Sequence, residues 1–216
     1  MQFYGIKIGG CWVEEMRQPI VKTLLLLALL SAGSYEPKDG DIIFQTSLSS
    51  QSKAIQFATD SPYSHVGVVF LRENKPFVLE AVRTVRFTPL KRWIARGKEK
   101  SYLVMRSKQE LTVSQIRKLR LYGKLLKGRR YDQRFLWSDY EIYCSELVWK
   151  LYNGAGLVLT RTKTMRDYNF NDPAVRKLLK QRWGRELDWN EVVVAPADLL
   201  ESPLLSLAYH SQRKSK

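Results

Sequence analysis

Cysteine and histidine are scarce in this sequence: its 216 residues include two of each. Cys11 precedes the apolar run at 20–30, so removal of the N-terminus through that run would leave Cys144 alone and without a disulfide partner. Two histidines and one remaining cysteine supply no cluster of metal ligands, and we expect neither a metal nor another cofactor. A glycine-rich phosphate loop is also missing, since Gly9-Gly10 lies ahead of the apolar run.

Acidic residues are few beside basic ones. The chain has 36 Lys and Arg against 21 Asp and Glu, a formal net charge of +15. This balance favours polyanions such as nucleic acid, anionic lipid or anionic envelope polymers as partners. The densest clusters lie at 124–130 and in a basic C-terminal tail at 213–216, without zinc-finger spacing or an RNP-type aromatic motif. We therefore expect no specific nucleic-acid site, and a solvated basic surface is the alternative to any polyanion site.

The longest apolar run, Ile20–Leu30, is too short to span a bilayer comfortably. A charged residue precedes it and small residues end at Gly33, which is typical of a secretory signal peptide. Residues 1–33 are therefore predicted to be a signal peptide, and the protein to be exported, periplasmic or secreted. Residues 1–15 can be a start-site artefact, because an ordinary signal peptide begins at Met16. An uncleaved membrane anchor is the alternative.

Residues 34–216 are predicted to form one domain. The whole chain is 44% hydrophobic and 12% aromatic, enough for a sizeable core. Apolar runs predict strands at 41–45, 64–71, 76–85, 102–106 and 191–194, the second and third forming an antiparallel hairpin. Helical spacing predicts helices at 49–59, 91–95, 112–126, 143–152, 174–183 and 196–200. This pattern indicates an α+β fold, with one helical layer on a mostly antiparallel sheet.

The helix predicted at 143–152 begins with a candidate nucleophile, Cys144. Leu147, Val148 and Leu151 share its face at i+3, i+4 and i+7, which indicates a buried helix. A thiol must lose its proton to act as a nucleophile, and a helix N-terminus, an imidazolium or nearby cations favour the thiolate. A small core residue is the alternative for a lone cysteine on an apolar helix face.

A cysteine nucleophile needs a base, and His65 is the only plausible one. It starts an apolar strand, whereas His210 lies near a chain end. Glu80 is the best candidate to orient the imidazole, because a carboxylate in the apolar partner strand is costly to bury unpaired. The alternatives are a structural histidine and a Glu80 that pairs with Arg83 or Arg86.

Three runs carry a family resemblance: Gly40–Phe44 (GDIIF), Tyr63–Gly67 (YSHVG) and Tyr143–Val148 (YCSELV). They resemble the YiiX-like branch of the NlpC-type papain-like superfamily. In that permuted branch the histidine motif precedes the cysteine helix, as it does here, whereas ordinary papain-like enzymes have the cysteine first. The resemblance covers roughly residues 38–200.

The resemblance implies a permuted papain-like fold, a small antiparallel β-barrel or sheet with the cysteine helix packed on it. It implies a catalytic triad of Cys144, His65 and Glu80 that cleaves an amide or ester through an acyl-enzyme. Tyr143, just before the nucleophile, is a candidate substrate-binding or oxyanion residue. Relatives include cell-wall peptidases and lecithin-retinol-acyltransferase-like enzymes, so the catalytic class is better indicated than the substrate.

Three functions are compatible with these observations. The first is an exported thiol peptidase or amidase acting on a cell-wall peptide. The second is a lipid-directed thioesterase or acyltransferase, which the basic and aromatic run Arg134–Trp137 favours. The third is a non-catalytic binder of anionic polymers. An apolar tunnel to Cys144 would favour the second function, a polar groove with Arg or Lys the first, and a buried Cys144 far from His65 the third.

Overall fold

The computed structural model describes residues 7–8, 11–12, 34–183 and 187–211. The chain divides into two units, 1–36 and 37–216. In the first unit, the two short strands β1 (Lys7–Ile8) and β2 (Cys11–Trp12) pair antiparallel. The apolar run of the predicted signal peptide and the basic tail at 213–216 lie outside the described residues. Within the described residues, none of the helices is both long and apolar enough to cross a bilayer.

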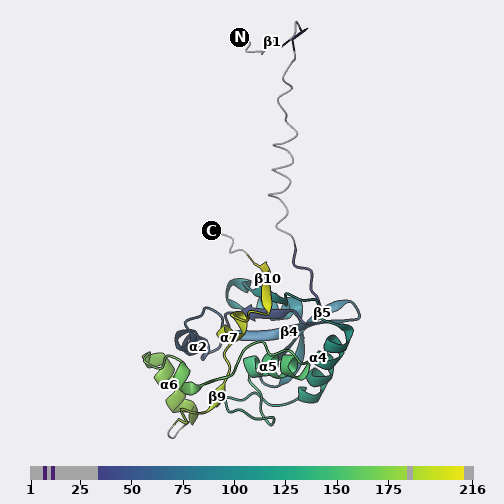
Figure 1. Ribbon diagram of the computed structural model, residues 1–216. Helices are drawn as coiled ribbons and strands as arrows, with labels where there is room; N and C mark the ends of the chain where they lie inside the picture. The colour runs from purple at the N-terminus through teal and green to yellow at the C-terminus, as the bar shows by residue number, and fades with distance from the viewer. Residues whose placement is uncertain (1–6, 9–10, 13–33, 184–186, 212–216) are drawn as a thin grey trace. The chain divides into compact units, whose positions relative to one another are not determined.

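The second unit is built on a six-stranded antiparallel sheet with strand order β10-β7-β3-β4-β5-β6 (Figure 1). Its strands are β3 (Ile42–Gln45), β4 (His65–Arg72), β5 (Lys75–Ala81), β6 (Val85–Pro89), β7 (Leu103–Ser107) and β10 (Leu205–His210). The sheet is open, with β10 and β6 at its edges. The resemblance implies either a β-barrel or a sheet, and the structure has an open sheet. The predicted α+β class is confirmed.

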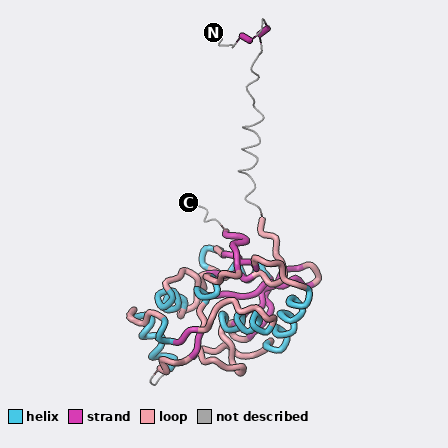
Figure 2. Tube along the Cα trace, viewed as in Figure 1, coloured by secondary structure: helices cyan, strands magenta, loops and turns pink. Residues whose placement is uncertain are grey.

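Helices and loops cover this sheet (Figure 2). The helices are α2 (Ser52–Thr59), α3 (Leu90–Ala95), α4 (Val113–Leu126), α5 (Cys144–Gly154), α6 (Pro173–Trp183) and α7 (Pro196–Leu200). Two short 3-10 turns are η1 (Lys98–Lys100) and η2 (Met165–Asp167), and a small second sheet pairs β8 (Lys163–Thr164) with β9 (Val192–Val193). Helix α5 packs on β4 and β5, α4 packs beside α5, and α2 packs against α6.

The main core lies between the sheet and α5. Strand residues that face the helix are fully buried; they include Ile42, Phe44, Val66, Val68 and Phe70. The three helix residues predicted to be buried, Leu147, Val148 and Leu151, are each 0% exposed. Full burial of such a side chain contributes about 1.5–3 kcal/mol. This packing holds the first residue of α5, Cys144, against the beginning of β4.

The structure departs from the predicted elements in three places. The strand predicted at 76–85 is interrupted at residues 82–84, where the Val82 amide donates to the Thr84 carbonyl and the chain turns into β6. The strand predicted at 191–194 is short and pairs only with β8, outside the main sheet. Residues 205–210, where no element is predicted, form the edge strand β10; most of its side chains are exposed, so its sequence shows no buried face. His210 accordingly ends a paired strand instead of a frayed tail.

Candidate active site

His65 and Glu80 meet across two neighbouring strands. His65 Nε2 lies 2.8 Å from Glu80 Oε2. In the register of β4 and β5, Val68 lies opposite Leu79, which places His65 and Glu80 two residues away from direct opposition. Their contact is therefore diagonal, at a spacing that long side chains can bridge on one face of a sheet.

Gly67 allows β4 to pack closely against β5, the strand that carries Glu80. A Cβ at this position would come 2.5 Å from Val78 Cγ1 and 2.8 Å from the Leu79 carbonyl oxygen. Real Cβ atoms essentially never make such short contacts, so an added methyl group would displace the strand that carries Glu80. The glycine of the YSHVG run is thus required by close packing of β4 on β5.

Glu80 is fully buried and is bound by side chains from three elements. Besides His65, Arg96 Nη2 donates to both carboxylate oxygens at 2.6 and 2.7 Å, and Thr88 Oγ1 donates to Oε1 at 2.5 Å. Burial raises the pKa of Glu80, but the hydrogen bond and charge of His65, with those from Arg96 and Thr88, lower it to about 2. The carboxylate is therefore ionised at neutral pH, and its cation is Arg96 instead of Arg83 or Arg86.

Helix α3 holds the imidazole from one side. The Trp93 ring stacks on the His65 ring, with centroids 5.9 Å apart and planes at 25°. Trp93 is completely buried, so it limits rotation of the imidazole. Arg96 follows three residues later at the end of α3, on the same face as Trp93. Sequence reasoning missed both residues, although their spacing of three in a short helix was visible.

Cys144 is the first residue of α5, one residue after the predicted helix start, and Tyr143 is the N-cap. Burial lowers the pKa of His65, but hydrogen bonds to Cys144 and Glu80 and the charges of both raise it to about 9. Since Glu80 occupies Nε2, Nδ1 is the ring nitrogen left for the Cys144 side chain. The structure brings Cys144, His65 and Glu80 into one buried cluster, in which the imidazole carries a positive charge at neutral pH.

Two neighbours of Cys144 fix the start of α5. Glu146 Oε2 accepts the Tyr143 amide proton at 3.2 Å, and its Oε1 lies 2.9 Å from Lys150 Nζ. Burial raises the pKa of Glu146 to about 7 against the opposing effect of Lys150. The Tyr143 hydroxyl accepts a hydrogen bond from the Val194 amide at 3.2 Å. Glu146 thus acts on the helix end, and Tyr143 ties that end to the segment after β9.

Tyr131 is a second hydroxyl near the nucleophile, one that sequence reasoning missed. It lies in the loop between α4 and α5, and burial, followed by the charge of Cys144, raises its pKa. Gln51 Nε2 donates to the Tyr131 oxygen at 2.9 Å, while Arg182 donates to Gln51 Oε1. Because Gln51 is the donor, the phenolic proton of Tyr131 is left to be donated to another group.

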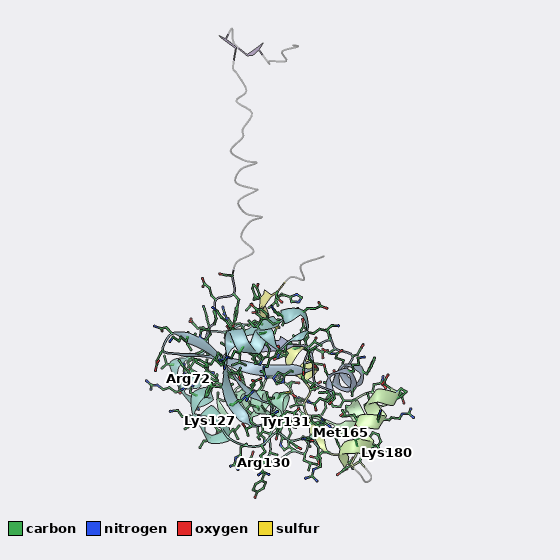
Figure 3. All side chains as sticks on the ribbon, turned by 180° about the vertical axis from the view of Figure 1, so that it is seen from behind. Arg72, Lys127, Arg130, Tyr131, Met165 and Lys180 are labelled. Atoms are coloured by element: carbon green, nitrogen blue, oxygen red, sulfur yellow. The ribbon has the colours of Figure 1, made fainter. Side chains whose placement is uncertain are left out.

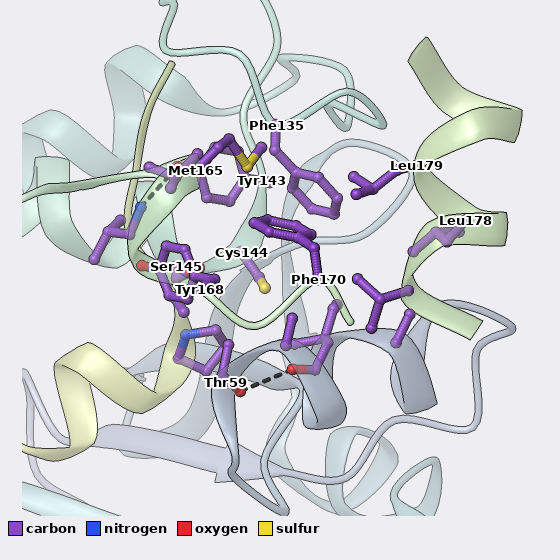
Figure 4. Close-up of a pocket in the computed structure, with 18 residues that line it drawn as sticks. Thr59, Phe135, Tyr143, Cys144, Ser145, Met165, Tyr168, Phe170, Leu178 and Leu179 are labelled. Carbon is purple, nitrogen blue, oxygen red and sulfur yellow. Dashed lines mark hydrogen bonds between the residues drawn. The ribbon is translucent and has the colours of Figure 1, made fainter. Parts of the chain in front are cut away.

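A hollow that we call the apolar pocket opens at Cys144 (Figure 4). Figure 4 shows the Cys144 sulfur pointing among apolar side chains from α2, α6 and the loops, with Leu178 and Leu179 of α6 on its far side. Phe135 and Phe170 also line it, and its exposed lining surface is apolar throughout. The cavity volume is about 90 Å³. His65 is not part of this lining.

A different hollow, the polar groove, opens on the His65 side. Most of its lining residues have polar side chains; the lining comprises Gln45, Ser47, Leu48, Ser49, Ser50, Gln51, Ser64, His65, Ala81, Val82, Arg96, Tyr131, Gln133 and Arg182. The pair of Cys144 and His65 therefore separates two environments. An apolar passage to Cys144 is expected for a lipid-directed enzyme, and a polar groove with Arg or Lys for a peptide-directed one. The structure has an apolar pocket on one side of Cys144 and His65 and a polar groove on the other.

Known proteins resemble this chain over most of its length. Residues 36–209 match the family described as permuted papain-like amidase enzymes, YaeF/YiiX, C92 family. The chain is 44% identical over 187 residues to the uncharacterized protein YiiX of Escherichia coli K12, a match that covers 85% of this chain and 93% of that protein. A crystal structure described as metalloprotein yiiX from Escherichia coli O157:H7 has a TM-score of 0.79 and 43% identity, over 82% of this chain and 99% of that one.

The term metalloprotein is part of the description of the Escherichia coli structure and refers to that protein. Among the residues described for this chain, no three His, Cys, Asp or Glu side chains gather where they could hold a metal ion. In the cluster itself, both oxygens of Glu80 already accept hydrogen bonds from Arg96, which leaves a poor ligand set. What this chain shares with its structural neighbour is the fold, at a TM-score of 0.79 over 82% of this chain. On the match across residues 36–209, the chain belongs to the permuted papain-like amidases of the YaeF/YiiX, C92 family.

Proposed function

We propose that this protein is a cysteine hydrolase that cleaves an amide bond through an acyl-enzyme on Cys144. The observation that carries the proposal is the position of His65, whose Nε2 lies 2.8 Å from the ionised Glu80 and whose pKa is raised by the neighbouring Cys144 as well as by Glu80. Membership of an amidase family supports the reaction class. The sequence criterion for a non-catalytic binder is a Cys144 far from His65; the effect of Cys144 on the pKa of His65 argues against that arrangement.

The proposed reaction has two steps. In the first, the His65 imidazolium already holds the proton that the Cys144 thiol has given up, the Cys144 sulfur attacks the amide carbon, and the C–N bond breaks as His65 gives its proton to the leaving amine. In the second, water attacks the thioester while His65 accepts one of its protons. The acid then leaves, and the pair of Cys144 thiolate and His65 imidazolium is restored. Glu80 stays ionised throughout and stabilises the imidazolium, which gives up its proton in the first step and forms again in the second.

Two donors are available for the oxyanion of the tetrahedral intermediate. The Cys144 backbone amide lies at the N-terminus of α5, where helix amides lack intrahelical partners. The phenolic proton of Tyr131 is the second, since Gln51 fixes the oxygen from the other side. The Tyr143 hydroxyl bonds the Val194 amide, so for Tyr143 we propose the substrate-binding role, as a wall of the apolar pocket.

The two hollows support a proposal for where each half of the substrate binds. His65 protonates the leaving amine, so the amine half must lie on the His65 side, in the polar groove. The acyl half stays bonded to Cys144 and must extend into the apolar pocket. We therefore propose an apolar acyl group joined to a polar amine. An acyl thioester or ester, the lipid-directed alternative, would place its acyl chain in the same pocket.

The pocket volume limits the acyl group. The cavity of about 90 Å³ is several times the minimum of about 10–15 Å³ that a single water needs. This space suits a medium acyl chain or one large apolar side chain better than a full membrane lipid chain. The side chain of a cell-wall peptide, in contrast, is mostly small or polar, so the apolar pocket favours an N-acyl amine over such a peptide.

A chain-length series tests this assignment. The kcat/KM for acetyl, hexanoyl, octanoyl and palmitoyl amides of one polar amine should rise by about tenfold or more from acetyl to octanoyl and rise no further for palmitoyl, because buried methylenes contribute about 0.8 kcal/mol each. Leu179→Trp should fill the pocket and reduce the rate for octanoyl but not for acetyl. Equal rates for acetyl and octanoyl amides in the wild type would contradict the proposed acyl pocket.

The site of action is a separate proposal. The short apolar run and the small residues that end at Gly33 support export, with residues 1–33 removed from the mature protein. The hydrolase domain, residues 34–216, would then meet its substrate outside the cytoplasm. The positive charge of the chain supports contact with anionic envelope polymers or lipid.

A further inference from the structure

A basic hollow continues from the polar groove. We call it the arginine pocket, and its lining is Val82, Arg83, Thr84, Arg130, Tyr131, Gln133, Arg134, Glu141, Gln181 and Arg182. Four of these residues, Val82, Tyr131, Gln133 and Arg182, also line the polar groove. A substrate whose amine half lies beside His65 therefore reaches the arginine pocket by extending past Tyr131.

The charges in this pocket are strongly unbalanced. Its lining has four arginines and one carboxylate, that of Glu141, which leaves three positive charges in excess. Arg182 is engaged, since it donates to Gln51 and, at 2.7 Å, to the Gln133 carbonyl. Arg83, Arg130 and Arg134 are exposed, and within the described part of the chain no ion pair or hydrogen bond of their guanidinium groups is recorded. These three groups are available to a ligand.

The backbone holds this pocket in place relative to the nucleophile. The Tyr131 amide donates to the Arg83 carbonyl at 3.0 Å, and the Ile142 amide donates to the Arg130 carbonyl at 2.9 Å. Isolated β-bridges pair residue 84 with residue 130 and residue 130 with residue 141. Cys144 follows Ile142 by two residues. The loop that carries Arg130 and Tyr131, both labelled in Figure 3, is thus tied to the β5–β6 turn and to the segment that enters α5.

We infer that the arginine pocket binds an anionic group, a carboxylate or phosphate, carried by the amine half of the substrate. Guanidinium groups match the planar oxygens of carboxylate and the oxygens of phosphate through paired, charge-assisted hydrogen bonds. The inference rests on the proposed function, because that function places the amine half in the polar groove. The substrate class becomes a medium-chain N-acyl derivative of an anionic amine, apolar at one end and negatively charged at the other.

Two chromogenic esters test the inference: nitrophenyl octanoate and its analogue with a carboxylate on the nitrophenyl ring. Their acyl groups are identical, and only the charge of the leaving group differs. The wild type should prefer the charged ester by about tenfold in kcat/KM, once intrinsic reactivity is corrected with a small thiol. The variant R83Q/R130Q/R134Q should lose this preference and keep the wild-type rate on the neutral ester, which also shows that it is folded.

A matched variant controls for net charge. R117Q/K118Q/K124Q removes three exposed positive charges from α4, which contributes no residue to either hollow on the His65 side, and should keep the preference. Inorganic phosphate should compete with the charged ester in the wild type and not in the arginine variant. Phosphate that instead accelerates the neutral ester through the same arginines would assign the pocket to a free anion and overturn the inference.

The remaining outcomes distinguish a failure of this inference from a failure of the proposed function on which it rests. Equal wild-type rates on the two esters, with Cys144 acylated by both, would overturn the arginine pocket alone. An equal loss of preference in the arginine and control variants would do the same, since it would trace the effect to overall charge. A wild type in which neither ester acylates Cys144 would overturn the proposed function, and this inference with it.

Discussion

Arg96 and His65 bind the same carboxylate, that of Glu80, with Arg96 Nη2 at 2.6 and 2.7 Å from its two oxygens and His65 Nε2 at 2.8 Å from Oε2. The histidine therefore shares its acidic partner with a permanent cation. That arrangement keeps Glu80 ionised, so the carboxylate can hold the imidazole without taking its proton. It also means that α3, which contains no recognisable catalytic motif, helps to position the site residues.

Removal of the carboxylate charge should slow catalysis without abolishing it. Glu80→Gln keeps the shape but no longer stabilises the imidazolium, so kcat/KM should fall by about 100-fold, less than for loss of Cys144. The pKa of His65 read from the pH profile should also fall, because Glu80 helps to raise it. Glu73→Gln, in the exposed turn between β4 and β5, is the control and should change neither quantity. A pH profile identical in wild type and Glu80→Gln would contradict the role of Glu80.

The charged pair should also make stability depend on pH. The fold raises the pKa of His65 from 6.5 to about 9, so its stabilisation is fully present below about pH 6.5 and is lost as the pH rises through about 9. The fold lowers the pKa of Glu80 from 4.5 to about 2, so its contribution is present above about pH 4.5 and is lost as the pH falls through about 2. The pair should stabilise most between about pH 4.5 and 6.5.

Urea unfolding of the wild type and His65→Gln measures this dependence. The difference in free energy of unfolding between the two proteins should be larger at about pH 6 than at about pH 9.5, because the wild type loses its imidazolium over that range. A difference that stays constant across the range would show that His65 is not charged in the folded protein.

Gly67→Ala should disturb the site through the strands. The added methyl group would meet Val78 Cγ1 and the Leu79 carbonyl, at a cost of about 1–3 kcal/mol in unfolding free energy, and would move Glu80 away from His65. Activity should fall together with stability. Gly128→Ala is the control: its φ of +89° costs about 1 kcal/mol, but its Cβ meets nothing within 4 Å, so activity should persist. Full activity in folded Gly67→Ala would contradict this account.

Export has its own test. Protein recovered outside the cytoplasm should begin near residue 34, because the short apolar run and small residues suit signal peptidase. N-terminal sequencing or intact mass measures this directly. An intact N-terminus on membrane-bound protein would instead support the uncleaved anchor.

The sequence predicted the centre of the site and missed its surroundings, for a physical reason. Cys144 and His65 lie in strongly patterned elements, a buried helix and a buried strand, where an unusual polar residue stands out. Arg96 and Tyr131 lie at the end of a short helix and in a long loop, where polar residues are ordinary and only tertiary contacts reveal a role. Edge strand β10 was missed because its stability comes from backbone pairing with β7, which leaves no alternation of buried and exposed side chains.

The nucleophile and its base should behave as one unit. Cys144→Ala and His65→Ala should each lower kcat by about 1,000-fold or more, and the double variant should lose little beyond either, because neither group works without the other. Multiplicative losses in the double variant would show that the two residues act independently.

Turnover of an octanoyl amide by Cys144→Ser tests the central claim most directly. The substitution changes little in volume and a helix start tolerates a hydroxyl, so the melting temperature should stay near that of the wild type. We predict that hydrolysis falls by at least about 1,000-fold and that the acyl-thioester adduct, found on the Cys144 peptide of the wild type, disappears. Wild-type turnover by folded Cys144→Ser would show that the thiol is structural and that this chain does not act through an acyl-enzyme on Cys144.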